Sequence, residues 1–308
     1  MERSALPQGG QILLTGATGQ VGSELLETLK LLGEVIAPAR TQLDLANPAS
    51  VREMIRAVRP RWIVNPGAYT AVDKAESEPE LAYAINAEAV KVIGQEAKLL
   101  GAGVIHFSTD YVFDGTGAEP YRETDAPSPV SAYGASKLAG EMALADSGAS
   151  HMIFRTSWVY GAKGKNFLRT ILKLARERDT LRIVADQFGV PTWSRDLAKM
   201  TAESIKHCEA VAESGELAAV LADVGGVYHA AGAGETTWYG FAAEAVRLQR
   251  ELHPKVRFAE IEPITTAEYP TPVRRPLNSR MNCDKLFARF GWKMMDWHES
   301  LRRVSAEI

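Results

Sequence analysis

The chain has 308 residues, 46% of them hydrophobic, and a formal net charge of −3. This length suffices for two lobes or one large α/β domain, and the near-neutral charge argues against nucleic-acid and membrane partners. The two cysteines, Cys208 and Cys283, imply no disulfide framework. We see neither a signal peptide nor an apolar run long enough to span a bilayer, so we expect a cytoplasmic protein.

The first predicted strand, residues 11–14, runs into a glycine-rich turn. Gly16, Gly19 and Gly22 mark this turn, and residues 23–32 then show the apolar periodicity of a helix. Glycines at such a turn allow close approach of the backbone to a pyrophosphate at the helix N-terminus. The spacing is Gly-x-x-Gly-x-x-Gly, and an ordinary tight turn is the alternative. Its place at the first strand of an α/β chain favours dinucleotide binding.

The second predicted strand, residues 35–37, ends in Pro38-Ala39-Arg40. A carboxylate here would bind the ribose 2′-hydroxyl of NAD, whereas an arginine accommodates the 2′-phosphate of NADP. Arg40 therefore predicts NADPH, with NADH possible, and a solvated surface arginine is the alternative. Asp44 and Leu45 follow on a short apolar stretch that reaches the adenine.

Strands and helices then alternate, which is the pattern of a doubly wound parallel sheet of Rossmann type. A helix from residue 47 to about 59 precedes a strand at 62–65, and a long helix is expected at 81–100. Between them, the strand leaves through small residues against which a cofactor can lie, including Ala68, Tyr69 and Thr70.

A third group of residues carries the predicted chemistry. Residues 103–107 read as a buried strand, which places Thr109 at its carboxyl end, where ligands bind in open α/β sheets. In a helix over residues 129–145, Tyr133 and Lys137 lie on one face, one turn apart. An ammonium near a phenol lowers the phenol's pKa, and the Thr109 hydroxyl can polarise the same substrate oxygen. Each signal alone is weak, because most Tyr-x-x-x-Lys pairs lie on an ordinary helix surface and a Ser-Thr at a strand end often caps the next turn.

The second half predicts a strand at 151–157, followed by Trp158 as either a stacking wall or a core residue. Helices are expected near 163–178, 195–207 and 238–252, strands at 227–230 and 256–261, and two short helices close the chain. Residues 213–226 give no strong element signal. We expect a dinucleotide-binding domain over 1–161. Segments near 181–205 and 226–232 return either to this domain or to its interface with the second domain. A smaller C-terminal α/β substrate domain covers 162–308. The six histidines are scattered, so we expect no metal site.

Taken together, several blocks resemble the extended short-chain dehydrogenase/reductases, and most closely those that make dTDP-L-rhamnose. The resemblance covers nearly the whole chain. It rests on residues 16–22, on Tyr69-Thr70-Ala71-Val72-Asp73-Lys74-Ala75-Glu76, on Ser108-Thr109-Asp110-Tyr111-Val112-Phe113, on Arg155-Thr156-Ser157-Trp158, on Asp186-Gln187 with Pro191-Thr192, and on Arg275-Pro276 with Asn278-Ser279. The chain has Asn65-Pro66-Gly67-Ala68 where the resembled proteins more usually have Asn-Ala-Ala-Ala.

The resemblance implies that NAD(P)H delivers hydride to the 4-keto carbon of dTDP-4-dehydro-L-rhamnose. It implies that Tyr133 is the acid, that Lys137 lowers its pKa and holds the nicotinamide ribose, and that Thr109 helps polarise the ketone. Asp110 and Trp158 would line the sugar. The implied cofactor contacts are Gly19, Gln20 and Val21 at the pyrophosphate, Asp44 and Leu45 at the adenine, and Ala68, Tyr69 and Thr70 in the middle.

Three alternatives stay open. One is a nucleotide-sugar dehydratase or epimerase on the same scaffold, although the dehydratases resemble Thr-Asp-Glu where this chain has Thr109-Asp110-Tyr111. Another is a different nucleotide-sugar reductase. The last is a non-catalytic NADP-binding regulatory subunit. We expect a monomer or a homodimer.

Overall fold

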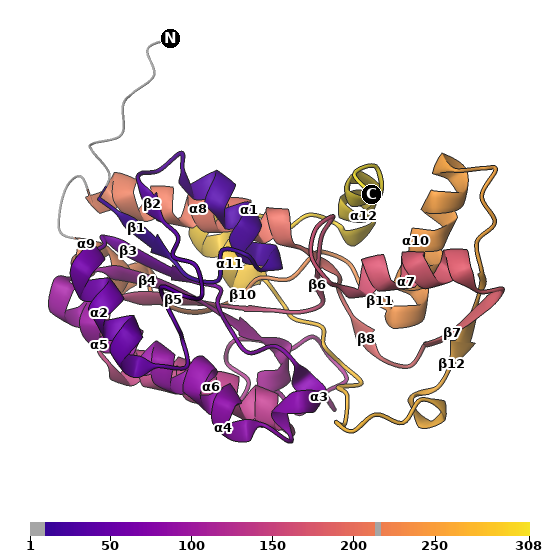
Figure 1. Ribbon diagram of the computed structural model, residues 1–308, viewed down its shortest axis with the longest axis horizontal. Coiled ribbons are helices and arrows are strands. Elements are labelled where there is room, and N and C mark those ends of the chain that lie inside the picture. The colour runs from indigo at the N-terminus through magenta and orange to yellow at the C-terminus, as the bar shows by residue number, and fades with distance from the viewer. Residues whose placement is uncertain (1–9, 213–216) are drawn as a thin grey trace, which may run out of the picture.

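The computed structural model describes residues 10–212 and 217–308 (Figure 1). The expectations for residues 1–9 and for 213–216 therefore lie outside the described residues. A sheet of six strands has the order β10-β5-β4-β3-β1-β2, and all its neighbouring strands are parallel. This confirms the predicted fold class. The strands are β1 (Ile12–Leu14), β2 (Val35–Ile36), β3 (Trp62–Asn65), β4 (Gly103–Thr109), β5 (His151–Thr156) and β10 (Gly226–His229).

Helices cover both faces of this sheet, as Figure 1 shows. Neighbouring side chains of β1 point to opposite faces, so Ile12 and Leu14 pack on one side and Leu13 on the other. This is why the strands read as continuous apolar runs. One face packs against α1 (Gln20–Leu29), α8 (Ser194–Ala212), α9 (Leu217–Val224) and α11 (Asp284–Phe290). The other packs against α2 (Pro48–Val58), α5 (Ala89–Leu100) and α6 (Ala132–Asp146).

One prediction about helices was wrong, and another was confirmed with one irregularity. No element was expected over 213–226, but α9 buries Leu217, Val220, Leu221 and Val224, an apolar stripe at helical spacing. The long helix expected at 81–100 is present as a continuous run with one irregular turn. It consists of α4 (Pro79–Tyr83), a π-helical turn η1 (Ala84–Glu88) and α5. Such turns often occur at functional sites.

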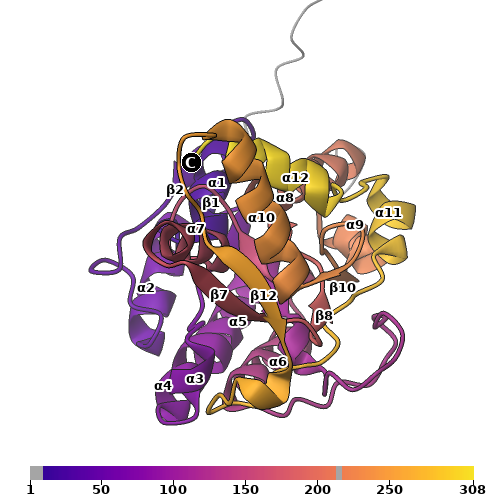
Figure 2. The same cartoon turned by 90° about the vertical axis from the view of Figure 1, so that its right-hand side faces the viewer.

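A second core lies beside the large sheet and faces the viewer in Figure 2. Its short strands pair as β7 with β12, β6 with β9, and β8 with β11, and the predicted strand at 256–261 is shifted to β12. The remaining elements are α3 (Val72–Ala75), η2 (Asp110–Val112), β6 (Val159–Tyr160), α7 (Phe167–Glu177), β7 (Thr180–Val184), β8 (Phe188–Gly189), β9 (Thr192–Trp193), β11 (Thr236–Thr237), α10 (Trp238–Leu252), β12 (Glu260–Ile264), η3 (Thr266–Glu268) and α12 (Trp297–Ser305).

The chain crosses between the two cores more than once. After α7 and β7 it returns, so that α8 packs against α1 and β10 becomes an edge strand of the large sheet beside β5. The domain boundary near residue 161 stays a prediction. No helix in the described ranges is both long and apolar enough to cross a membrane.

Candidate active site

The glycine-rich turn forms a cradle at the N-terminus of α1. Gly16 has a φ of +56°, and a Cβ on Gly22 would lie 2.0 Å from the Gly16 carbonyl oxygen, so neither position tolerates a side chain. Gly19 is the N-cap without a side-chain cap, and the first turn carries no acidic residue. The backbone N–H groups of this turn are therefore available to an anion such as a pyrophosphate.

The cradle lies where the strand order reverses. The neighbours of β1 are β2 on one side and β3 on the other, which makes the carboxyl end of β1 a topological switch point. The segments that follow β1 and β3 touch here, because a Cβ on Gly16 would lie 2.7 Å from the Gly67 Cα. A hollow of about 180 Å³ opens beside them, lined by Thr15, Gly16, Ala17, Thr18, Pro38, Ala39, Arg40, Leu43, Asp44, Leu45, Gly67, Ala68 and Ile85.

This hollow brings together five of the residues proposed for the cofactor, namely Gly16, Arg40, Asp44, Leu45 and Ala68. The sequence reasoning missed Leu43 and Ile85. Leu43 belongs to the short apolar stretch before Asp44, whereas Ile85 comes from the π-helical turn and gave no signal. Arg40 is exposed on the rim, and the carboxylate of Asp44 accepts a hydrogen bond from the Ala46 N–H at 3.0 Å.

Two further proposed cofactor residues are fixed by side chains from other elements. The Gln20 Oε1 accepts a hydrogen bond of 3.0 Å from Asn166, which also caps α7. The backbone N–H and carbonyl of Tyr69 both bond to the amide of Asn86, at 2.8 and 3.0 Å. Thr70 follows and is exposed, and Val21 on α1 packs against the core.

Asn86 is a residue that the sequence reasoning missed. It lies in the π-helical turn η1, is buried, and also donates to the Ser136 hydroxyl on α6 at 3.0 Å. It thus ties the loop after β3 to the helix that carries Tyr133. A π-helical turn has no simple periodicity signal, which explains the omission.

Tyr133 and Thr109 meet at the carboxyl end of β4. Ser131 caps α6 by accepting from the Gly134 N–H at 3.1 Å, and Gly134 lets the helix start close to η2, since its Cβ would lie 2.1 Å from the Tyr111 carbonyl oxygen. Tyr133 is nearly fully buried, and burial raises its pKa while a hydrogen bond with Thr109 lowers it. The phenol is therefore held protonated, as a proton donor requires.

Lys137 lies one turn further along α6 and is 2% exposed. Its Nζ donates to the Phe107 carbonyl oxygen at 2.6 Å and lies 3.1 Å from the His106 Nε2. Burial lowers the pKa of Lys137 to about 8, and Glu141 opposes this shift. The groups that act on the pKa of Tyr133 are Thr109, Asp110 and Tyr111. The effect of Lys137 on Tyr133 stays a prediction.

Asp110 and Trp158, the residues proposed to line the sugar, follow neighbouring strands. Asp110 follows β4 and Trp158 follows β5, and Thr109 of β4 pairs with Thr156 of β5. Asp110 is buried, and burial raises the pKa of its carboxyl to about 6 against hydrogen bonds from Ser279 and Thr109. Trp158 has a φ of +47°, a conformation that bulky residues rarely adopt outside functional sites. Its ring stacks on Trp238 at 3.6 Å.

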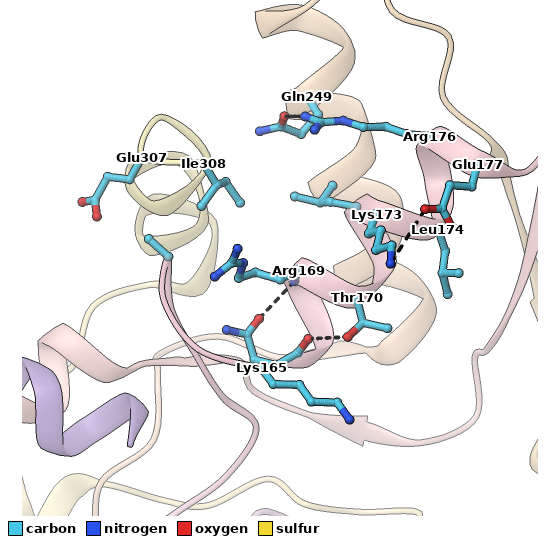
Figure 3. A pocket seen from close by; sticks show the side chains of 13 residues that line it. Lys165, Arg169, Thr170, Lys173, Leu174, Arg176, Glu177, Gln249, Glu307 and Ile308 are labelled. Carbon is cyan, nitrogen blue, oxygen red and sulfur yellow. Dashed lines mark hydrogen bonds and ion pairs between the residues drawn. The ribbon is translucent and has the colours of Figure 1, made fainter. Parts of the chain in front are cut away.

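A larger hollow of about 800 Å³ lies elsewhere, between α7, α10 and residues 307–308. Figure 3 shows that long polar side chains line it, among them Lys165, Arg169 and Arg176. None of the residues predicted for catalysis or cofactor binding lines this hollow. Within the part of the chain that the structure describes, no group of three or more His, Cys, Asp or Glu side chains is arranged to hold a metal ion.

Comparison with known proteins identifies the family of this chain. Residues 10–308 match the family model for the RmlD substrate binding domain. A dTDP-4-dehydrorhamnose reductase of Burkholderia thailandensis is 47% identical over 93% of this chain and 95% of its own length. One of Escherichia coli K12 is 46% identical over 96% of this chain and 97% of its own.

Solved structures of similar proteins indicate the same family and fold. A dTDP-4-dehydrorhamnose reductase of Bacillus anthracis in complex with NADP superposes with a TM-score of 0.87 at 32% identity, covering 98% of this chain and 100% of that one. A UDP-glucose 4-epimerase of Thermus thermophilus shares the fold alone, with a TM-score of 0.75 at 20% identity over 96% of this chain and 98% of that one. The chain therefore belongs to the RmlD family, together with these dTDP-4-dehydrorhamnose reductases.

Proposed function

We propose that the protein reduces the 4-keto group of dTDP-4-dehydro-L-rhamnose to the hydroxyl of dTDP-L-rhamnose, with NADPH as the preferred and NADH as a usable donor. The observation that carries this is the placement of a protonated Tyr133 against Thr109, at the carboxyl end of β4. The dinucleotide cradle lies at the same edge of the sheet. A carbonyl there can receive a proton and a hydride together.

The residues of this chain have separate tasks in that step. When bound, the nicotinamide supplies the hydride. The Thr109 hydroxyl binds the ketone oxygen, and the Tyr133 hydroxyl gives it the proton, which leaves a phenolate that needs a new proton. Lys137, one turn further along α6, is the residue that we assign to that task. Asp110 accepts hydrogen bonds from sugar hydroxyls, and Trp158 offers an aromatic face to the sugar ring.

The alternatives differ at identifiable positions. A dehydratase would need a second carboxylate beside Asp110, but the next residue is Tyr111, whose hydroxyl accepts a hydrogen bond from Arg275 at 3.1 Å. A regulatory subunit would not need Thr109, Tyr133 and Lys137 gathered in one place. A different nucleotide-sugar reductase would share the catalytic residues and differ at the residues that contact the sugar, for which we propose Asp110 and Trp158.

The test is the oxidation of NADPH, followed at 340 nm, with dTDP-4-dehydro-L-rhamnose as substrate and the Tyr133→Phe variant as the control. We expect turnover of the substrate. We also expect that the purified protein carries no stoichiometric cofactor. Absence of turnover at saturating ligand would refute the reductase. Tightly retained NAD would favour an epimerase or dehydratase.

We also propose that the protein works in the cytoplasm on this nucleotide sugar, without nucleic-acid or membrane partners, as a monomer or homodimer. Light scattering coupled to gel filtration distinguishes the two assemblies.

A further inference from the structure

A continuous chain of buried hydrogen bonds connects the cofactor hollow to Lys137. The Gly67 N–H donates to the Thr15 hydroxyl at 3.2 Å, and this hydroxyl donates to the Asn65 Oδ1 at 2.5 Å. The Asn65 Nδ2 lies 3.1 Å from the His106 Nδ1. The chain ends with the contacts of Lys137 to His106 and to the Phe107 carbonyl.

Every side chain of this series is fully or almost fully buried, and the fold fixes the order. Asn65 of β3 and His106 of β4 are register partners in the sheet, so their side chains lie on the same face next to one another. Thr15 follows β1 on the other side of β3, and Lys137 reaches in from α6. Neither Asn65 nor His106 lines the hollow, whereas Thr15 does.

The donors and acceptors of this series of hydrogen bonds allow two arrangements of the protons, which we call the first and the second setting. Burial lowers the pKa of His106 well below its ordinary value, so the imidazole is neutral and carries one proton. If Asn65 Nδ2 donates to Nδ1, that proton is on Nε2 and points at Lys137, which must then be an uncharged amine. In this setting the Thr15 hydroxyl donates to the Asn65 Oδ1, so its proton is not available to a ligand in the hollow.

In the second setting Lys137 is an ammonium and donates to Nε2. The imidazole proton then moves to Nδ1 and needs an acceptor, so the Asn65 amide turns over and its Nδ2 donates to Thr15. The Thr15 oxygen now accepts from both Gly67 and Asn65, and its own proton is free to point into the hollow. One proton on Lys137 thus corresponds to one direction of the Thr15 hydroxyl.

Other ionisable groups lie around this series of hydrogen bonds. Glu141 on α6 acts on Lys137 and is paired with Arg155 of β5 at 2.6 Å, and His151 of β5 acts weakly on His106. Tyr133 lies on α6, one turn before Lys137.

We propose that Asn65 and His106 are positioning residues that couple the protonation of Lys137 to the cofactor pocket through Thr15. The proposal rests on the proposed reductase function. A cofactor that accepts a hydrogen bond from Thr15 favours the second setting and so charges Lys137. Each reduction consumes one proton, so this coupling would load the proton when the cofactor arrives.

The test is the uptake of protons during NADP+ binding, without any sugar nucleotide. Calorimetric titrations at pH 8, in two buffers that differ in ionisation enthalpy, give the number of protons bound per NADP+. Thr15→Ser keeps the hydroxyl and Thr15→Val removes it at nearly equal size. We expect the wild-type protein and Thr15→Ser to take up a fraction of a proton, and Thr15→Val to take up half of that or less.

Equal uptake by Thr15→Val and Thr15→Ser would overturn the coupling. If Thr15→Val fails to bind NADP+, His106→Phe decides, because residue 106 does not line the hollow. Uptake by His106→Phe equal to that of the wild-type protein would also overturn the proposal. A protein that shows the expected uptake but does not reduce dTDP-4-dehydro-L-rhamnose would refute only the substrate assignment.

Discussion

The two ends of the candidate site are built in different ways. The cofactor end relies on backbone: Gly16, Gly22 and Gly67 bring main-chain segments together, and its charged residues, Arg40 and Asp44, are exposed. The acid–base end relies on side chains that are nearly all buried and hydrogen-bonded, such as Thr109, Tyr133 and Lys137. Changes at the first end should therefore alter affinity, and changes at the second should alter rate or stability.

The largest effect is expected at the buried end. Tyr133→Phe removes only the donated proton, because the ring still packs against Tyr111. Turnover should fall by about 10²–10⁴-fold, the usual contribution of a positioned acid. Steady-state kinetics give kcat, and fluorescence titration should show almost unchanged NADPH affinity. An unaltered kcat would remove Tyr133 from the mechanism.

Asp110 offers a pH-dependent test of burial at the same end. Its folded pKa of about 6 lies above the ordinary value of 3.8, so the folded state binds the proton more tightly. The stabilisation that this proton gives to the folded state is complete below about pH 4 and is lost as pH rises through 6. Asp110→Asn should match the wild-type protein at pH 4 and be more stable at pH 8 by roughly 2–3 kcal/mol.

Chemical denaturation of both proteins at the two pH values measures this difference. A stability gap that is the same at pH 4 and pH 8 would show that ionisation of Asp110 is not its cause.

Much of this contrast follows from sequence, and the reasons differ between the two ends. The glycine spacing and the alternation of strands and helices are local signals, and they predicted the parallel sheet correctly. Five of the residues proposed for the cofactor also line one hollow, and their role there stays a prediction. Asn86 and His106 gave no such signal. Their roles arise from a π-helical turn and from the register between β3 and β4, which only the assembled fold defines.

At the exposed end, Arg40→Ala tests how the cofactor is chosen. Arg40 lies on the rim of the hollow and Ala39 offers no carboxylate. A hydrogen bond to a charged group contributes about 1.5–3 kcal/mol, so NADPH affinity should fall roughly ten- to hundredfold. NADH affinity should stay nearly constant. The NADPH affinity of Arg40→Lys should lie between those of the wild-type protein and Arg40→Ala, because lysine keeps the charge without the planar fork of donors. Equal losses for both cofactors would rule out recognition of the 2′-phosphate.

The smallest effect is expected just behind the exposed end. Asn47 caps α2, and its side chain accepts from the Ala49 N–H at 3.0 Å. Asn47→Ala should lower the free energy of unfolding by about 1 kcal/mol, the usual value of an N-cap. Binding constants for NADPH should not change. A loss of affinity larger than the loss of stability would mean that the cap also shapes the hollow.

The return of α8 and β10 to the large sheet has a consequence for synthesis of the protein. Leu25 and Leu29 of α1 share a core cluster with Leu197 and Met200 of α8, and β10 ends only at His229. At the usual 5–20 residues per second, a ribosome needs roughly 10–40 s between making β1 and completing that sheet. During this interval the apolar face of α1 has no native cover, so the nascent chain is expected to depend on chaperones until α8 emerges.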